Sequence, residues 1–383
     1  MRFNIKNGTT TFRVVCAVLF FLFVFLYVFE YQADILAVTQ HVLSKGQTHY
    51  DRTIGAIIIT LVLWLIQLAI YAMSRLNGAF HALTYFPSLL LLGILTDISP
   101  NIDSENYLGN WLWGYPLLLI VFALVVWLCR QYETIHSQDK STSIIKSLWG
   151  NSLIMLMMFL MVCGIGNSDN VFHYRMHIEE AITTNDYASA SEIGYKDEKT
   201  DSSLTFLRIW TLSKNHELGE KLFEYRLVGG SDVMLPNGTS VKLMMVPETN
   251  LYKELGVWFD KKMRPIEYLT LLHERHYATP LSHDWLLCAY LLDGNLDLFV
   301  KTLPKFYNVR KNLPKHYREA LTLYMHQSGH PTIVYRNNVM EADFEDFQAL
   351  RLKNKDPRIQ YSTLRDSYGK TYWLYYYTLM NKL

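Results

Sequence analysis

The first 166 residues are dominated by long apolar runs, whereas polar and apolar positions interleave from residue 167 onward. A helix needs about 20 mostly apolar residues to cross the hydrocarbon core of a bilayer. Five runs approach or reach that length, at residues 14–31, 54–73, 79–98, 111–129 and 148–166. The third is the least regular, because it contains Pro87, His81 and Tyr85. The pattern predicts a transmembrane domain over residues 1–166 and a second domain over residues 167–383.

Lys and Arg residues near the ends of the spans predict an orientation, because they favour the cytoplasmic side of a membrane. The N-terminal arm and every second loop after it hold seven of these residues, and the two alternate loops hold two. In a bacterial inner membrane this asymmetry predicts a cytoplasmic N-terminus. After five spans it predicts that residues 167–383 form a periplasmic domain.

Three segments of this second domain place an Asn between two helical patterns, at Asn185, Asn215 and Asn295. Asn tolerates the left-handed turn and caps a following helix. In each segment an apolar residue stands three positions before the Asn, another three after it and a third eight after it. These residues are Ile182, Ala188 and Ile193 in the first segment, Leu212, Leu218 and Phe223 in the second, and Leu292, Leu298 and Leu303 in the third. The first spacing, 30 residues, is close to the tetratricopeptide period of about 34. The next is 80, so we expect an all-α fold with an irregular tetratricopeptide-like helical-repeat domain, and a plain helical domain is the alternative.

The rest of the second domain contains one sequence pattern typical of strands and several patterns typical of helices. Asn237-Gly238 between short apolar runs predicts a small β-hairpin or an extended arm within residues 233–246. Further helices are expected at 250–260, 265–275, 315–327, 340–353 and 366–380. The last segment is rich in aromatic residues, which could close the repeat stack, form a groove for peptide or glycan, or lie at the lipid surface. We favour the first interpretation. These residues are Tyr361, Tyr368, Tyr372, Trp373, Tyr375, Tyr376 and Tyr377.

Three segments of the second domain, at residues 284–292, 313–321 and 369–376, are similar to segments of known proteins. They resemble a group of uncharacterised polytopic membrane proteins of Bacteroidota that have a tetratricopeptide-like helical tail. The resemblance implies an inner-membrane protein of a Gram-negative bacterium. It implies no activity, no catalytic residue and no cofactor.

Charge narrows the classes of partner. The 383 residues include 36 Lys and Arg against 35 Asp and Glu, a net charge of +1. A phosphate backbone calls for a clear basic excess, so this balance argues against nucleic acid as a partner. We expect the lipid bilayer and a protein or peptide held by the tail as partners.

The outer loops suggest one catalytic hypothesis. Glu30 and Asp34 lie one turn apart just beyond the first span, and Asp51 lies later in the same loop. Polytopic glycosyltransferases that use lipid-linked sugars are similar in placing a carboxylate at the first outer loop, where it serves as base or metal ligand. A membrane transferase is therefore the alternative to a scaffold. The competing explanation is that carboxylates gather outside because positive charge stays inside.

A metal site is the second chemical hypothesis. His173, His177 and Glu180 share one helical face, and two His one turn apart with a carboxylate can bind zinc. No His-Glu-x-x-His, Gly-x-Ser-x-Gly or phosphate-loop motif occurs in the sequence. We therefore expect neither a metal nor a cofactor, and favour an envelope scaffold or interaction protein over an enzyme.

Overall fold

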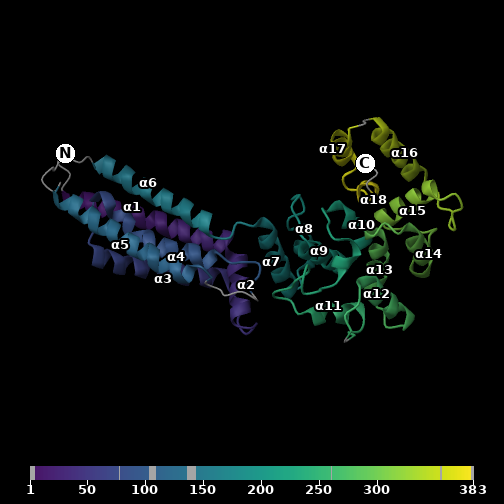
Figure 1. The fold of residues 1–383 in the computed structure, drawn as a ribbon, viewed down its shortest axis with the longest axis horizontal. Helices are drawn as coiled ribbons and strands as arrows, with labels where there is room; N and C mark the ends of the chain where they lie inside the picture. The colour runs from purple at the N-terminus through teal and green to yellow at the C-terminus, as the bar shows by residue number, and fades with distance from the viewer. Residues whose placement is uncertain are drawn as a thin grey trace. The chain divides into compact units, whose positions relative to one another are not determined.

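The computed structural model describes residues 5–76, 78–102, 109–135, 144–259, 261–353 and 356–380. Over these ranges the chain is helical and contains no strand, which confirms the predicted all-α class. The chain folds as two compact units, Met1–Met176 and His177–Leu383. The division falls within α7 (Asn170–Thr183), ten residues beyond the change in composition near Gly166. Figure 1 shows the succession of helices from α1 to α18.

The first unit contains the long apolar helices. They are α1 (Ile5–Leu26), a π-helical turn at Tyr27–Tyr31, α2 (Ala33–Leu43), α3 (Arg52–Ser74), a 3-10 segment at Gly78–Tyr85, α4 (Phe86–Thr96), α5 (Trp111–Ile135) and α6 (Ile144–Ile165). Within this unit α1 packs against α3 and α6, and α4 packs against α3, α5 and α6. Five helical segments of the described chain are long and apolar enough to cross a membrane, as predicted.

The irregular third run forms one of these five segments, Gly78–Thr96. Its first part is a 3-10 helix, and Pro87 stands in the first turn of α4. A proline is tolerated there because its missing N–H would have no intrahelical acceptor in that turn. Pro87 therefore marks a change from 3-10 to α geometry and does not end the helical segment.

Uncharged polar side chains join the apolar helices to each other. Asn151 accepts a hydrogen bond from the Ala82 N–H at 2.7 Å and donates to the Gly78 carbonyl at 2.8 Å. Gln67 donates to Thr84 Oγ1 at 3.0 Å. In contrast, α3 and α5 expose large apolar side chains, among them Leu65, Leu117 and Ile120. Polar groups inside and apolar groups outside suit a bundle surrounded by lipid.

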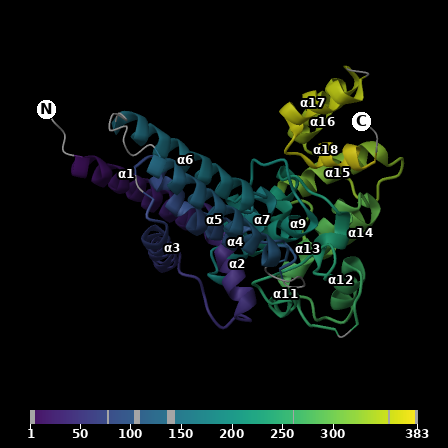
Figure 2. The ribbon, with the colours of Figure 1, turned by 60° about the vertical axis from the view of Figure 1, so that its left-hand side comes forward.

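The second unit is built from shorter helices. They are α8 (Tyr187–Glu192), α9 (Ser202–Lys214), α10 (Leu218–Lys221), 3-10 turns at Leu222–Glu224 and Gly230–Met234, α11 (Glu248–Leu255), α12 (Pro265–Glu274), α13 (Pro280–Leu292), α14 (Leu296–Phe306), α15 (Lys315–Gln327), α16 (Asn338–Lys353), α17 (Pro357–Tyr368) and α18 (Tyr372–Leu379). From α12 to α18 each helix packs against the next one along the chain. Figures 1 and 2 show α15 to α18 gathered at one end of this unit.

Each predicted Asn turn lies between two helices, and the three turns share one way of ending the first helix. The left-handed residue is Asn185 in the first, His216 in the second and Gly294 in the third. The residue after it donates its N–H to a carbonyl five residues earlier, at 2.9, 2.9 and 2.8 Å. This pairing satisfies a carbonyl that the helix end would leave free. Of the apolar residues expected at these turns, Ala188 and Leu298 are exposed.

Of the two alternatives for residues 233–246, the β-hairpin is wrong, because side chains accept hydrogen bonds from the backbone N–H groups that a strand ladder would use. The Asn237 Oδ1 atom accepts from the N–H groups of residues 239, 240 and 241, at 2.9 to 3.1 Å. The buried Glu179 carboxylate accepts from the N–H groups of Met244 and Met245 at 2.8 and 2.7 Å. The Asn-Gly turn therefore exists, but the chain after it is an irregular arm fixed to α7.

The aromatic segment predicted as one helix at 366–380 is divided between α17 and α18. Thr371 begins α18 by accepting the Leu374 N–H. Most of the aromatic side chains pack inside the unit, and Tyr372, Trp373, Tyr376 and Tyr377 are buried. These four buried rings form part of the packing at that end of the unit.

Candidate functional site

A groove with a volume of about 470 Å³ lies on the second unit. Three segments line it: residues 195–198 after α8, residues 223–230 after α10, and the facing sides of α17 and α18. These segments are far apart in the sequence, so only the packing of the unit brings them together. We refer to this feature as the groove.

Apolar and aromatic side chains form much of the groove surface. α18 contributes Leu374, Tyr375 and Leu379, and the 223–230 segment contributes Leu227 and Val228. Leu379 is 41% exposed and Val228 is 38% exposed, so both are accessible. Tyr375 is fixed in place, because its hydroxyl donates to the Leu292 carbonyl at 2.8 Å.

The rim of the groove carries charges of both signs. Arg365 pairs with Glu198 at 2.7 Å, joining α17 to the loop after α8. Arg226 donates to the Tyr361 hydroxyl, also at 2.7 Å. These contacts join opposite sides of the rim, and because the groups involved are exposed they cost little to rearrange when a ligand enters.

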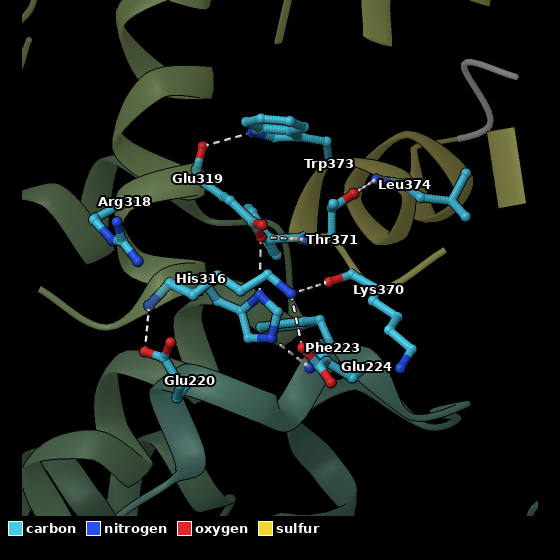
Figure 3. Close-up of polar contacts among 12 residues, drawn as sticks. Glu220, Phe223, Glu224, His316, Arg318, Glu319, Lys370, Thr371, Trp373 and Leu374 are labelled. Carbon is cyan, nitrogen blue, oxygen red and sulfur yellow. Dashed lines mark hydrogen bonds and ion pairs between the residues drawn. The ribbon is translucent and has the colours of Figure 1, made fainter. Parts of the chain in front are cut away.

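A buried network lies behind residues that line the groove (Figure 3). His316 and Glu319 stand one turn apart on α15, and both side chains are almost completely buried. The Phe223 N–H donates to His316 Nε2 at 3.2 Å, so this nitrogen carries a lone pair. The proton is then on Nδ1, which donates to Glu319 Oε2 at 2.8 Å. The geometry therefore assigns a neutral imidazole with both nitrogens engaged.

Glu319 connects α15 to the start of α18. Its Oε2 atom also accepts from the Tyr372 N–H at 2.7 Å. Its backbone carbonyl accepts from Trp373 Nε1 at 2.8 Å (Figure 3). Burying a carboxylate costs free energy unless its oxygens accept hydrogen bonds, and the His316 and Tyr372 N–H groups provide these bonds. The His316–Glu319 pair thus fixes two groove segments to α15, the one around Phe223 and the one that begins α18.

Lys315 adds an ion pair beside this network. Its ammonium group donates to Glu224 Oε1 at 2.7 Å and to the Lys370 carbonyl at 2.8 Å. Tyr195 donates to the other Glu224 oxygen at 2.9 Å. Burial by itself would raise the pKa of Glu224, but the hydrogen bonds from Lys315 and Tyr195 outweigh it and hold that pKa below its ordinary value.

Arg208, buried within α9, fixes two walls of the groove. It donates to the Gly194 carbonyl and to the Arg226 carbonyl, each at 3.0 Å, and to Thr200 Oγ1 at 3.2 Å. Its guanidinium also lies over the Tyr225 ring, 5.2 Å from the centroid. Because a guanidinium offers five donors in a rigid plane, one side chain can hold both loops. The groove is therefore a preformed feature of the unit.

The outer-loop carboxylates predicted from the sequence have separate environments in the first unit. Asp34 is buried and pairs with Arg52 at 2.6 Å. Asp51 is exposed and caps α3 by accepting the Ile54 N–H at 2.8 Å. Glu30 lies in the π-helical turn and is exposed. Asp34 therefore forms an ion pair and Asp51 a helix cap. Asp103 and Glu105, two acidic residues between the third and fourth apolar runs, lie outside the described residues.

The three predicted metal ligands, His173, His177 and Glu180, all lie on α7, but their side chains are not grouped around a common point that could hold a metal ion. His173 Nε2 contacts the Asn167 carbonyl at 3.2 Å, and its ring packs against Tyr31. His177 is exposed and Glu180 is half-buried. In the described part of the chain no group of three or more His, Cys, Asp or Glu side chains is placed to hold a metal ion.

The residues that shape the groove carry little signal in the sequence. His316 is one of several scattered histidines, and no motif points to Arg208 or Glu319. His316 and Glu319 lie three residues apart on one helical face, which is a visible local signal. Their partner Phe223 is 93 residues away from His316 and is bound through its backbone, so no pattern of residue types could indicate it.

Residues 258–379 match the model of a family of unknown function (DUF6057). The match covers about a third of the chain and includes α15, α17 and α18, but not the groove segments at 195–198 and 223–230. Neither a curated protein nor a solved structure matches the chain.

Proposed function

We propose that this protein is a membrane-anchored interaction protein of the bacterial cell envelope, which binds an extended segment of a partner protein in the groove of its second unit. The observation that carries the proposal is the groove itself. It combines an apolar and aromatic surface with a rim of mixed charge, and a buried network holds its walls.

The composition of the groove favours a peptide over a small charged metabolite. Tyr and Arg residues are enriched at protein interfaces, and the groove has both, at Tyr361, Tyr375, Arg226 and Arg365. The apolar residues would accept side chains of the segment, while the rim would accept its polar groups. Preformed walls lower the entropy cost of binding.

The geometry around His316 favours binding over catalysis. A general base needs a free nitrogen within hydrogen-bond reach of a substrate. His316 uses Nε2 to accept from Phe223 and Nδ1 to donate to Glu319. The imidazole therefore serves to position the chain.

We place the protein in the inner membrane, with the second unit in the periplasm. Support comes from the five apolar helices and from the seven-to-two distribution of Lys and Arg between alternate loops. Reporters fused after Leu383 that are active only in the periplasm, or only in the cytoplasm, test the orientation. A cytoplasmic signal would contradict it and would move the partner to the cytoplasm.

Peptide selection tests the binding role. The full chain in neutral detergent micelles is panned against a library of random peptides, and selected peptides are titrated into purified variants. We expect Leu379→Asp and Val228→Asp to weaken binding at least tenfold, because each buries a charge under the ligand. Leu352→Asp is the matched control, because Leu352 is 72% exposed on α16 and does not line the groove. Equal binding by groove and control variants would refute the role of the groove.

A further inference from the structure

A second pocket, with a volume of about 670 Å³, lies on the same unit. Its walls are the loop between α14 and α15, the start of α15, and the loop between α15 and α16. Four of the residues that line it are cationic, Arg310, Lys311, Arg318 and Arg336, and none is acidic. We call it the cationic pocket.

This concentration of charge is local. The whole chain has a net charge of only +1, because acidic and basic residues are almost equal in number. Some cations elsewhere in the unit have carboxylate partners, as in the Lys315–Glu224 and Arg365–Glu198 pairs. Over the described ranges none of the four pocket cations forms an ion pair, so their fields add and attract an anion.

Arg318 is the least exposed of the four. It extends from α15, and its Nε atom is buried without a hydrogen-bond partner among the described residues. Figure 3 draws Arg318 apart from the His316 and Glu319 side chains, with no dashed line joining it to either. A buried guanidinium donor without an acceptor is costly, and an anion in the pocket would offset that cost through the guanidinium.

Polar groups of the pocket complement the charges. Thr332, Tyr335 and Asn337 line the loop between α15 and α16, and the Asn337 amide donates to the Tyr335 hydroxyl at 3.3 Å. Asn337 also accepts the Met340 N–H in the first turn of α16, so the N-terminal end of this 16-residue helix lies at the pocket.

We propose that the cationic pocket binds a phosphate-bearing anion, with Arg318 as the inner contact and Arg310, Lys311 and Arg336 around it. Guanidinium groups match the oxygens of phosphate in paired hydrogen bonds. Four cations suit the three to four negative charges of a pyrophosphate group better than the single charge of a carboxylate. Phosphate groups occur both in free phosphate compounds and in lipid headgroups, and either could supply the anion. This site is separate from the proposed peptide-binding groove.

Calorimetric titration of the full chain in neutral detergent micelles tests the proposal. Pyrophosphate and sulfate are titrated at equal ionic strength, alongside short-chain dihexanoylphosphatidic acid and dihexanoylphosphatidylcholine. We expect one site, with pyrophosphate or phosphatidic acid binding at least tenfold more tightly than sulfate and phosphatidylcholine. Tight pyrophosphate binding indicates a free ligand, and binding of phosphatidic acid alone indicates a lipid headgroup.

Two variants and a control complete the test. Arg318→Met should weaken binding of the preferred anion at least tenfold. Arg336→Gln changes an exposed residue that has no ion pair among the described residues, and it should weaken anion binding about threefold to tenfold. Arg358→Gln, an exposed arginine of α17 outside the pocket, should stay within about twofold of the unchanged chain. Failure of both phosphate compounds to bind, affinity for sulfate equal to that for pyrophosphate, or equal loss in all three variants would overturn the proposal.

Discussion

His316 donates from Nδ1 to the Glu319 carboxylate, 2.8 Å away and one turn further along α15. The same carboxylate oxygen accepts the Tyr372 N–H at 2.7 Å. Because His316 Nε2 accepts from Phe223, this single pair joins α15 to two segments that line the groove. The stability of the second unit and the shape of its groove therefore depend on the same two side chains.

Glu319→Gln tests this dependence. The substitution preserves volume but removes the charged acceptor that His316 and Tyr372 share, so we expect the free energy of unfolding to fall by about 2–3 kcal/mol. Denaturant unfolding of the full chain in micelles, followed by tryptophan fluorescence, measures the change. Glu345→Gln on the exposed face of α16 is the control and should change the free energy by less than about 0.5 kcal/mol. Equal stability of the two variants would show that the buried pair contributes little.

Acid should weaken the unit through Glu224. Its pKa in the folded chain lies below the ordinary value of 4.5, because Lys315 and Tyr195 stabilise the charged form against the effect of burial. A depressed carboxyl pKa stabilises the fold above the unfolded value, and the contribution disappears as the pH falls through the folded value. The free energy of unfolding, measured between pH 6 and pH 3, should therefore fall below about pH 4.5. Glu224→Gln should flatten this dependence, and an unchanged slope would contradict the assignment.

Arg208→Met should loosen the groove walls. The variant keeps the apolar stem but leaves the Gly194 and Arg226 carbonyls without their donor, at a cost of about 2–3 kcal/mol. Limited proteolysis should then cut faster within residues 194–200 and 226–230. Arg358→Met on α17 is the control and should leave the cleavage pattern unchanged. Uniform acceleration at all sites would instead indicate global destabilisation with no special role in the walls.

Substitutions in the outer loop separate the scaffold from the transferase hypothesis. Asp51→Ala removes the cap of α3 and should destabilise the first unit by about 1 kcal/mol. Glu30→Gln changes an exposed side chain and should leave stability unchanged. In the scaffold account both variants keep full peptide binding. Loss of cellular function in Glu30→Gln, at normal protein level, would favour the transferase.

The sequence predicts the helical architecture well, because local patterns determine it. Apolar runs of bilayer length predict the five segments, and Pro87 does not interrupt the third because it falls in the first turn of α4. The Asn185, Asn215 and Asn295 turns also follow from local residues. The hairpin prediction failed at Asn237, where the turn signal was correct but Glu179, 65 and 66 residues from its partners Met244 and Met245, takes the N–H groups that a strand would use.

The groove could not be predicted from the sequence in the same way. Its walls come from residues 195–198, 223–230 and 361–379, and their approach depends on the contact of Phe223 with His316 and on Arg208. These are contacts between side chains and distant backbone groups, and they leave no periodic pattern. The candidate sites at Glu30, Asp34 and Asp51 and at His173, His177 and Glu180 could be named from the sequence because their members lie close together along the chain.

Photocrosslinking in the cells that make the protein tests the central claim most directly. A benzophenone amino acid replaces Leu379 in the groove in one strain and Leu352 on α16 in another, and both are irradiated at equal expression. Peptide binding in the groove predicts one discrete adduct from position 379, lost when Arg208→Met is added, and none of that size from position 352. The same adducts from both positions, or none from position 379, would contradict the account.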